Sequence, residues 1–562
     1  MDNALPIYNI RKDIKLALQN TNQLVIHAPP GSGKSTLVPQ FIIDDILKSH
    51  QSVLVLQPRR IAARLLANFI AAERKTETGV EVGYQIRLEN KQSDQTRILF
   101  VTEGILLNRL FSHDLLKDVG AVIFDEFHER HLETDLSLAL ALKLQSSKRP
   151  DLSIIVMSAT INLEKVNNIL NNAVTIESQG RSYPVEVFYA QPRSYETIWE
   201  FAANQLEVAL SGFTSGSALI FMPGAYEIRK TIEAILKRPR LTTFEVLPLH
   251  SSLSPTDQDR AVKQGGRKII VTTNIAETSV TLPGITLVID SGLARVARFD
   301  ARRGINTLFV EAISKSSADQ RTGRAGRLAP GKCIRLWSEF SHEYRQQDNI
   351  PEIHRLDLSE TILNLLAADE QPDHFLWIES PSDVALKNAF DVLSHIGAID
   401  THQVITQTGK RIARLNVHPR LGRVLIEAEN LHCLGAACLL VAITQSSGWI
   451  NSLSDAAMSK ERMDLFGHSG SDLIFEVNAW LWAKSCQFRA TDCSRMGINA
   501  GRARDIEKLT VQMIRKFTGQ NSYSLQQEKL EFDDSVKLRK CIFSGFSDFI
   551  AVRHRLNSPT CQ

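Results

Sequence analysis

The chain has 562 residues, of which 43% are hydrophobic and 23% charged, and its 29 glycines and 19 prolines exclude collagen-like and low-complexity proteins. A net charge of +3 neither indicates nor excludes a nucleic-acid-binding protein, because a balanced total can conceal a basic groove. The seven cysteines form no C-x-x-C pair, which argues against a disulfide framework or zinc finger and favours a reducing compartment. No apolar run approaches the ~20 residues of a membrane span, and the N-terminus lacks a signal-peptide pattern. We therefore expect a cytoplasmic chain without a membrane partner.

Two successive blocks of the chain alternate short apolar, β-branched runs with helical patterns. This alternation predicts two α/β domains with buried parallel sheets, at 1–177 and 178–345. The expected strands are 24–28, 52–58, 97–102, 121–126 and 153–160 in the first block, and 185–190, 217–224, 244–250, 268–273, 285–292 and 331–337 in the second. After about residue 345 strand-like runs become scarce, and the spacing of apolar residues predicts a mostly helical region.

The first expected strand runs into APPGSGKST, residues 28–36, which fits the P-loop pattern except that Ala28 replaces its first glycine. Glycines let backbone N–H groups curl around a phosphate, and the following helix N-terminus adds a partial positive charge. Lys34 can reach the β- and γ-phosphates, and the Ser35 hydroxyl can ligate Mg²⁺. The expected nucleotide-binding residues are Pro30, Gly31, Ser32, Gly33, Lys34, Ser35 and Thr36.

An acidic pair, Asp125 and Glu126, ends a later hydrophobic strand in the sequence AVIFDEFHER. P-loop proteins hold Mg²⁺ with an aspartate at such a position, and a second carboxylate can deprotonate an attacking water. The carboxyl ends of parallel strands form one edge of the sheet, so we expect Asp125 to lie near Ser35 and to share its metal. His128 follows two residues after the pair.

An arginine cluster, QRTGRAGR at 320–327, lies in the second block. Arg324 and Arg327 are three residues apart and would share one face of a helix. Arginines from a second domain can stabilise the charge of a transferring phosphoryl group. The alternative is a basic helix start on the surface.

These sites, in this order, resemble the DEAH-box helicases of superfamily two. Further segments support the resemblance: PRRIAA at 58–63, TEGIL at 102–106, DEFH at 125–128, SAT at 158–160 and TTNIAETSVT at 272–281 are similar to motifs Ia, Ib, II, III and V. DEFHER, with GRSYPVEVFY at 180–189 and ARFDARRG at 297–304, points to the bacterial HrpB-type branch of the HrpA/HrpB group.

The resemblance implies an α/β fold class with two tandem RecA-like P-loop domains, followed by a winged-helix region at 346–405 and a helical ratchet-like bundle at 406–530. An OB-like barrel normally comes next. Residues 531–562 are too few for five strands and would be only its truncated start. The resemblance therefore implies a C-terminally shortened member.

The same resemblance implies roles for individual residues in ATP hydrolysis. Glu126 would be the catalytic base, Gln320 would position the water, and Arg324 and Arg327 would be arginine fingers. His128, Ser158 and Thr160 would couple hydrolysis to domain closure. The implied cofactors are ATP, or other NTPs as well, and Mg²⁺.

RNA would cross both domains and be held by its backbone. The first domain would contribute Arg59, Arg60, Thr102 and Gly104, and the second Thr273, Asn274 and Thr278. Hydroxyls, amides, glycine N–H groups and arginines suit phosphate and sugar contacts without base readout. Family members also carry a strand-separating β-hairpin, which we expect within 291–314, where Arg295, Arg298, Arg302 and Arg303 supply positive charge.

The adenine clamp of the family is altered in this chain. Where relatives place an arginine and a phenylalanine around the base, this chain has Phe69 and Leu293. We expect Phe69 to pack in the core, and the missing arginine predicts loose nucleotide selectivity.

The leading hypothesis is an RNA-stimulated NTPase that translocates on single-stranded or tailed duplex RNA and unwinds it. One alternative is an ATP-gated RNA clamp without processive unwinding, and another is a helicase that acts on DNA. Backbone contacts do not separate RNA from DNA, because the 2′-OH contact is invisible in sequence.

Overall fold

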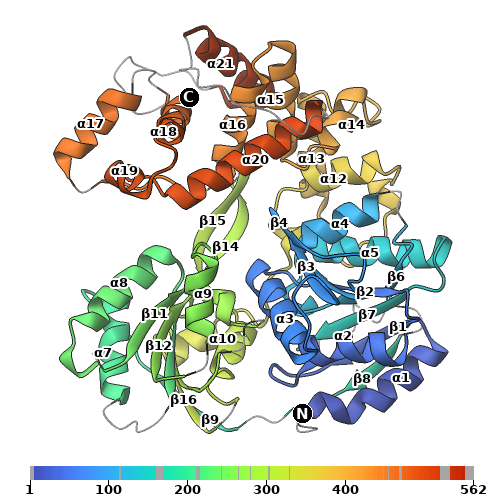
Figure 1. Cartoon of the computed structure of the whole chain (residues 1–562), viewed down its shortest axis with the longest axis vertical. Coiled ribbons are helices and arrows are strands. Elements are labelled where there is room, and N and C mark those ends of the chain that lie inside the picture. The colour runs from blue at the N-terminus through green and yellow to red at the C-terminus, as the bar shows by residue number, and fades with distance from the viewer. Residues whose placement is uncertain are drawn as a thin grey trace. The chain divides into compact units, whose positions relative to one another are not determined.

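The computed structural model describes residues 5–550 with gaps. The gaps are 113–114, 160–168, 171–172, 181–182, 211–215, 242, 264, 279, 281, 301–303, 328, 447, 454, 468–470 and 519–531. The chain forms two compact units, Met1–Leu356 with Leu376–Pro381, and Asp357–Phe375 with Ser382–Gln562 (Figure 1). The first unit holds two α/β sheets and the second is helical.

The first sheet of the first unit has the strand order β4-β3-β5-β2-β6-β7-β1-β8, and every neighbouring pair is parallel except β3 with β4. Its strands are β1 Gln23–His27, β2 Ser52–Leu56, β3 Val82–Ile86, β4 Glu89–Lys91, β5 Ile98–Val101, β6 Val119–Phe124, β7 Ser153–Ser158 and β8 Val174–Glu177. Apolar residues on alternate sides of the central strands form two cores, as expected of a parallel sheet that is covered on both faces.

Helices cover both faces of this sheet. One face packs against α1 Arg11–Asn20, α2 Lys34–Asp45 and α3 Arg60–Glu73, and the other against α4 Glu103–Phe111 and α5 Leu132–Ser147. Val53 and Val55 of β2 enter the first core, while Leu54 and Leu56 enter the second.

The second sheet is parallel throughout, with the order β11-β12-β10-β13-β16-β9. Its strands are β9 Val185–Tyr189, β10 Ser217–Phe221, β11 Glu245–Leu249, β12 Lys268–Thr272, β13 Ile285–Asp290 and β16 Gly331–Arg335. The helices of this part are α7 Ile198–Leu210, α8 Ala225–Leu236, α9 Pro255–Val262, α10 Lys315–Thr322 and α11 Glu339–Glu343. A separate antiparallel hairpin, β14 Leu293–Asp300 and β15 Ile305–Ala312, follows β13.

A hydrophobic core of the helical unit, formed by residues between Leu415 and Cys541, includes Trp449, Trp480 and Cys438. Its helices are α12 Ser359–Ala367, α13 Asp383–His395, α14 Gln407–Ala413, α15 Pro419–Asn430, α16 Leu434–Thr444, α17 Ala456–Phe466, α18 Asp472–Ser485, α19 Ala490–Arg495, α20 Ala500–Thr518 and α21 Phe532–Phe546. The buried Arg420 at the start of α15 forms a two-pronged ion pair with Asp548, at 2.6 Å for each prong, and so anchors the turn after α21.

All eleven expected strands are confirmed, and so is the hairpin within 291–314. Three further strands were not expected: β4 and β8 form the two edges of the first sheet, and β3 lies between β4 and β5. The described part of 531–562 contains the helix α21 and a short 3-10 turn instead of strands. Leu538 and Cys541 of α21 belong to the core of the helical unit, so this segment is part of that unit.

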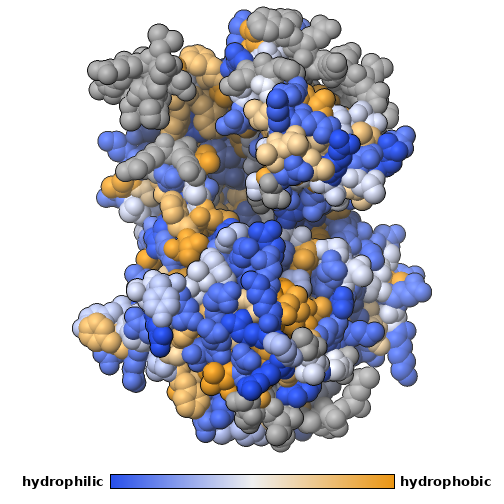
Figure 2. Space-filling model, turned by 90° about the vertical axis from the view of Figure 1, so that its left-hand side faces the viewer, coloured by the Kyte–Doolittle hydropathy of each residue, from blue (hydrophilic) through white to orange (hydrophobic). Residues whose placement is uncertain are grey.

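Hydrophilic side chains predominate on the face drawn in Figure 2, with scattered apolar patches, as is usual for a surface in water. Within the described residues no helix is both long and apolar enough to cross a bilayer.

Candidate nucleotide and nucleic-acid site

The P-loop follows β1 and leads directly into α2. Gly31 and Gly33 have φ angles of 85° and 93°, a region that favours glycine, and α2 begins at Lys34. The loop is therefore a tight turn that ends at a helix N-terminus, as phosphate binding requires. Ser32 is buried, and its hydroxyl has no hydrogen-bond partner among the described residues.

The other nucleotide-loop residues lie around this turn. Pro30 precedes it, Ser35 occupies the second position of α2, and Thr36 donates from Oγ1 to the carbonyl of Gly33 at 3.0 Å. The backbone N–H of Ala28 donates to the carbonyl of Ser158 at 3.0 Å, so the ends of β1 and β7 are joined beside the loop.

The acidic pair follows β6 at the same edge of the sheet, as predicted. The Lys34 Nζ lies 3.6 Å from Oε2 of Glu126, and both side chains are 4% exposed. Asp125 accepts a hydrogen bond from Ser35 and another from the backbone N–H of Glu126 at 2.9 Å. The lysine and serine of the P-loop and both carboxylates thus meet in one buried site.

The pKa values of the two carboxylates are shifted in opposite directions. Burial raises the pKa of Asp125 to about 6, and the Glu126 charge adds to this shift. Burial would also raise the pKa of Glu126, but the positive charge of Lys34 outweighs it and lowers that pKa. Glu126 is therefore ionised at neutral pH, and its Oε2 lacks a hydrogen-bond partner among the described residues. This arrangement suits a base that faces a substrate water.

The Glu126 backbone is held in an unusual conformation. Its φ and ψ are 54° and 35°, and Arg130 has 51° and 48°, so left-handed residues bracket the 3-10 turn Phe127–Glu129. A non-glycine residue in this region costs free energy and persists only where its surroundings demand it. The turn thereby fixes the direction of the Glu126 side chain.

His128 joins this turn to the end of β7. Its Nδ1 accepts the backbone N–H of Ala159 at 3.4 Å and lies 3.6 Å from Oε2 of Glu126. Burial lowers its pKa, so the imidazole is neutral and carries its proton on Nε2. Ser158, the last residue of β7, is buried, whereas Thr160 lies outside the described residues.

The arginine cluster differs from the helical prediction. The helix α10 ends at Thr322, so Arg324 and Arg327 lie in the turns beyond it and do not share a helix face. The glycine at 323 follows the last helical residue, and the chain turns there. Gln320 is half-buried in the last turn of α10.

The two arginines have different surroundings. The Arg324 guanidinium donates to the carbonyls of Glu277, Thr278 and Val280, so in this structure it holds the loop after β12. The Arg327 side chain lies against the P-loop, with Cδ 3.8 Å from where a Cβ on Gly31 would be. Its Nε is buried without a hydrogen-bond partner among the described residues, and burial lowers the pKa of Arg327 to about 10. A charged, incompletely bonded guanidinium thus borders the nucleotide loop.

The expected RNA contacts fall into two sets. Arg59, Asn274 and Thr278 are brought together: Arg59 donates to the Asn274 carbonyl, and both Arg59 and Thr278 bind Glu129. The other four lie at separate positions in the two α/β parts. Arg60 is exposed at the start of α3, Thr102 precedes α4, Gly104 approaches Glu133, and Thr273 precedes a short turn and accepts the N–H of Ile275.

Three features of the site were missed by sequence reasoning. Gln57, fully buried after β2, donates from Nε2 to Asp125. Glu129 binds Arg59 and Thr278, and its position in DEFHER next to His128 was the available signal. The fully buried Arg321 forms ion pairs with Glu277 at 2.9 Å and Asp290 at 2.8 Å. The expectation that Phe69 packs in the core is wrong, because its side chain is 53% exposed.

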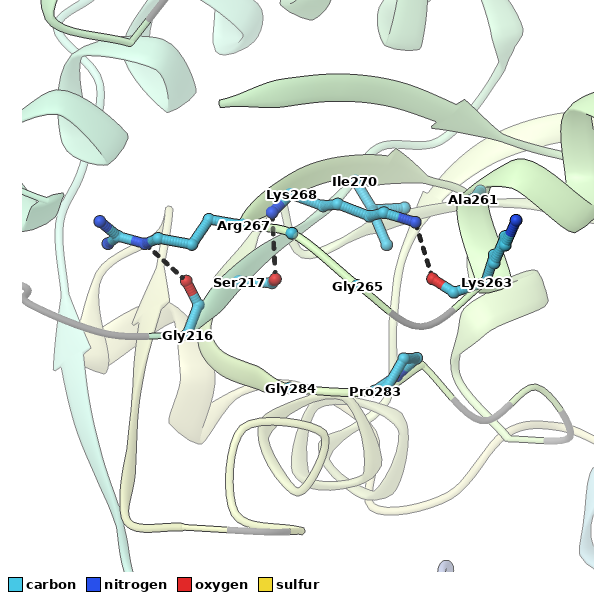
Figure 3. A pocket seen from close by; sticks show the side chains of 11 residues that line it. Gly216, Ser217, Ala261, Lys263, Gly265, Arg267, Lys268, Ile270, Pro283 and Gly284 are labelled. Atoms are coloured by element: carbon cyan, nitrogen blue, oxygen red, sulfur yellow. Dashed lines mark hydrogen bonds between the residues drawn. The ribbon is translucent and has the colours of Figure 1, made fainter. Parts of the chain in front are cut away.

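A depression of about 320 Å³ lies at the amino-terminal edge of the second sheet, near Ser217, Lys268 and Gly284 (Figure 3). Lys268 donates from Nζ to the carbonyls of Arg260 and Lys263, and Arg267 donates to that of Gly216. These cations are already bonded, and ligands of open α/β sheets bind at the opposite, carboxyl edge. We assign this depression no catalytic role.

Two models of known families each match most of one α/β part. The model described as DEAD/DEAH box helicase matches residues 9–169, and the model described as helicase conserved C-terminal domain matches residues 202–329.

Individual proteins match over nearly the whole chain. The yeast Saccharomyces cerevisiae protein named "Probable ATP-dependent RNA helicase DHR2" is 31% identical over 97% of this chain and 78% of its own length. The "ATP-dependent RNA helicase HrpA homolog" of Haemophilus influenzae is 32% identical over 98% of this chain. The crystal structure of Escherichia coli DEAH/RHA helicase HrpB superposes with a TM-score of 0.80 at 30% identity, over 98% of this chain and 64% of that chain. This chain spans 43% of the HrpA homolog.

Proposed function

Because this chain belongs to the DEAD/DEAH-box helicase family, we propose that it is an RNA-stimulated NTPase that hydrolyses ATP to translocate on RNA and unwind or remodel duplexes. The observation that carries this proposal is that the buried Lys34, Asp125 and Glu126 lie together with the half-buried Ser35 of the P-loop. Arg327 of the second α/β part lies against the same loop.

In the proposed reaction each residue has one task. Backbone N–H groups around Gly31 and Gly33, together with Lys34, hold the phosphates. Glu126, ionised and free of hydrogen bonds on Oε2 among the described residues, accepts the proton of the attacking water. Arg327 faces the charge that develops on the transferred phosphoryl group. The roles of Gln320 and Arg324 in catalysis remain predictions.

The residues present also fit Mg²⁺. This ion binds one or two protein ligands and completes its shell with phosphates and waters, instead of using an all-protein cage. Ser35 and Asp125 are hydrogen-bonded to each other at the P-loop, and the described residues hold no cluster of three His, Cys, Asp or Glu suited to a metal. Ser35 and Asp125 would hold the ion, and when bound it would neutralise phosphate charge.

We further propose a cytoplasmic site of action. It is supported by the six described cysteines, none of which is in a disulfide, as is typical of a reducing compartment.

The proposed function predicts that single-stranded RNA raises the steady-state rate of ATP hydrolysis by this chain. The reason is that the nucleotide-binding residues and the predicted RNA-binding residues follow neighbouring strands at the same edge of each sheet, so RNA bound there would lie close to the nucleotide site. The measurement is phosphate release with increasing RNA, beside the same titration with DNA of equal sequence. A rate that RNA does not change would contradict the proposal, and equal stimulation by DNA would favour the broader substrate class. Strand displacement on a tailed duplex then separates an unwinding motor from an RNA clamp.

Nucleotide selectivity is expected to be loose. Phe69 is exposed where relatives place an arginine, so the base would meet an aromatic face, which stacks on every base. We expect ATP, GTP, CTP and UTP to give kcat/KM values within about tenfold of each other, a gap of about 1.4 kcal/mol. A preference for ATP beyond about 100-fold, measured in the same phosphate-release assay, would contradict this expectation.

A further inference from the structure

Glu129 is the last residue of the 3-10 turn that follows the catalytic Glu126, and its side chain is 11% exposed. One carboxylate oxygen, Oε1, accepts hydrogen bonds from Nη2 of Arg59 at 3.0 Å and from Oγ1 of Thr278 at 2.6 Å. The other, Oε2, lies 3.3 Å from Nε2 of His131. A single carboxylate therefore joins its own segment to two distant segments of the chain.

Two of these segments carry predicted RNA contacts from different α/β parts. Arg59 immediately precedes α3 of the first part, and its Nη1 donates to the carbonyl of Asn274 in the second. Thr278 lies in the loop after β12 of the second part. RNA that binds Arg59 or Thr278 would therefore contact residues that are hydrogen-bonded to Glu129.

The bonds to Glu129 are charge-assisted. Burial would raise its pKa, but Arg59 and His131 outweigh burial and hold the pKa at about 2. His131 in turn is kept protonated by Glu103, which lies 2.8 Å from its Nδ1 and raises the pKa of His131 to about 10. Hydrogen bonds between ionised partners are roughly twice as strong as neutral ones, so this cluster is stable near neutral pH.

Within the turn, the backbone of Glu129 is hydrogen-bonded directly to that of the catalytic base, Glu126. The backbone N–H of Glu129 donates to the carbonyl of Glu126 at 3.0 Å. At the other end, the Arg130 side chain is anchored to Asp135 at 2.8 Å and Glu379 at 2.6 Å. Because the Arg130 side chain is held at both of these carboxylates, we infer that a displacement of Glu129 would move Glu126.

We propose that Glu129 is a positioning residue that couples RNA binding to hydrolysis by linking Arg59 and Thr278 to the turn that carries Glu126. This inference rests on the proposed function. In this proposal Glu129 does not contact the reacting phosphate. It positions the Glu126 side chain when RNA binds to both α/β parts.

The test is Glu129→Gln, which keeps the shape but removes the charge that holds Arg59. Affinity for a fluorescein-labelled oligouridylate is measured by anisotropy with and without a non-hydrolysable ATP analogue. In the wild type we expect these affinities to differ by roughly 5–150-fold, the usual range for coupled sites. In Glu129→Gln the ratio should approach one, and the ratio of RNA-stimulated to basal hydrolysis should fall with it.

Thr278→Val provides a second route to the same link, since it removes the hydroxyl that Glu129 binds while leaving the Arg59 pair. The two substitutions should be non-additive in the affinity ratio, because they break one network. The control is Glu233→Gln, an exposed residue of α8 paired with Lys230 at 2.8 Å, which should behave as the wild type. Melting temperatures of all variants identify any loss through unfolding.

An affinity ratio that stays at the wild-type value in folded Glu129→Gln and Thr278→Val would overturn the inference. So would an equal fall in basal and RNA-stimulated rates. A wild-type chain whose hydrolysis ignores RNA would instead contradict the proposed function, so the two failures are distinguishable.

Discussion

Replacing Glu126 by glutamine is expected to lower the kcat of RNA-stimulated ATP hydrolysis by about 10²–10⁴-fold, the usual contribution of a general base. The carboxylate is buried and ionised because Lys34 lies 3.6 Å away and lowers its pKa. Glutamine keeps the shape and the backbone turn but cannot accept a proton. The measurement is steady-state phosphate release at saturating ATP and RNA.

Binding should survive this substitution. The variant removes a negative charge beside the phosphate loop, so nucleotide affinity should be equal to or tighter than that of the wild type. Glu186→Gln is the matched control, because Glu186 is exposed on β9 and pairs only loosely with Lys332 at 3.6 Å. A variant that hydrolyses ATP within threefold of the wild type, a difference of about 0.6 kcal/mol, would contradict the role of Glu126 as the base.

Replacing Arg327 by alanine is expected to lower kcat by about 10³–10⁵-fold, the range measured for arginine fingers. The side chain lies against Gly31, and its Nε lacks a hydrogen-bond partner among the described residues. Because Arg327 is only half-buried and its Nε has no hydrogen bond to offset, its removal in the absence of nucleotide should lower the stability of the protein little. The melting temperature without nucleotide should therefore fall by less than about 2 °C, while catalysis collapses.

Replacing Arg327 by lysine separates the effect of the positive charge from that of the guanidinium geometry. Arg327→Lys keeps one charge but loses the planar fork of donors, so it should recover only a part of the rate. Arg260→Ala, which removes an exposed arginine paired with Glu245 at 2.8 Å, is the control. Retention of full kcat in Arg327→Ala would exclude the finger role of Arg327. Arg324 would then be the remaining candidate, although its guanidinium here donates to three carbonyls of the loop after β12.

Much of the site was predictable because its signals are local. The P-loop needs a strand, positive-φ glycines and a helix start within a few residues, and all of these lie in 23–36. The position of Asp125 and Glu126 follows from the end of one hydrophobic strand, and the parallel sheet brings that end to the P-loop edge. The family resemblance then supplied the roles.

Other features were not predictable because they depend on partners that are distant in the chain. Phe69 belongs to α3, and neighbours from elsewhere in the fold decide whether its ring is covered. The helical spacing of Arg324 and Arg327 was a sound local rule, but the chain turns at Gly323 and breaks the helix before them. Residues 531–562 were expected to be the start of a strand-rich barrel, but 532–546 form the helix α21, whose Leu538 and Cys541 pack into the core of the helical unit.

The sequence by itself determined the two sheets, the phosphate loop and the acidic pair, because hydrophobic periodicity and glycine conformation act over short stretches of chain. Only the tertiary structure decided which side chains meet. Gln57 and Asp125 are 68 residues apart, Glu129 and Thr278 are 149, and Arg59 and Asn274 are 215. No local pattern records such pairs, because their hydrogen bonds form only after strand order and helix packing have placed the ends of the elements together.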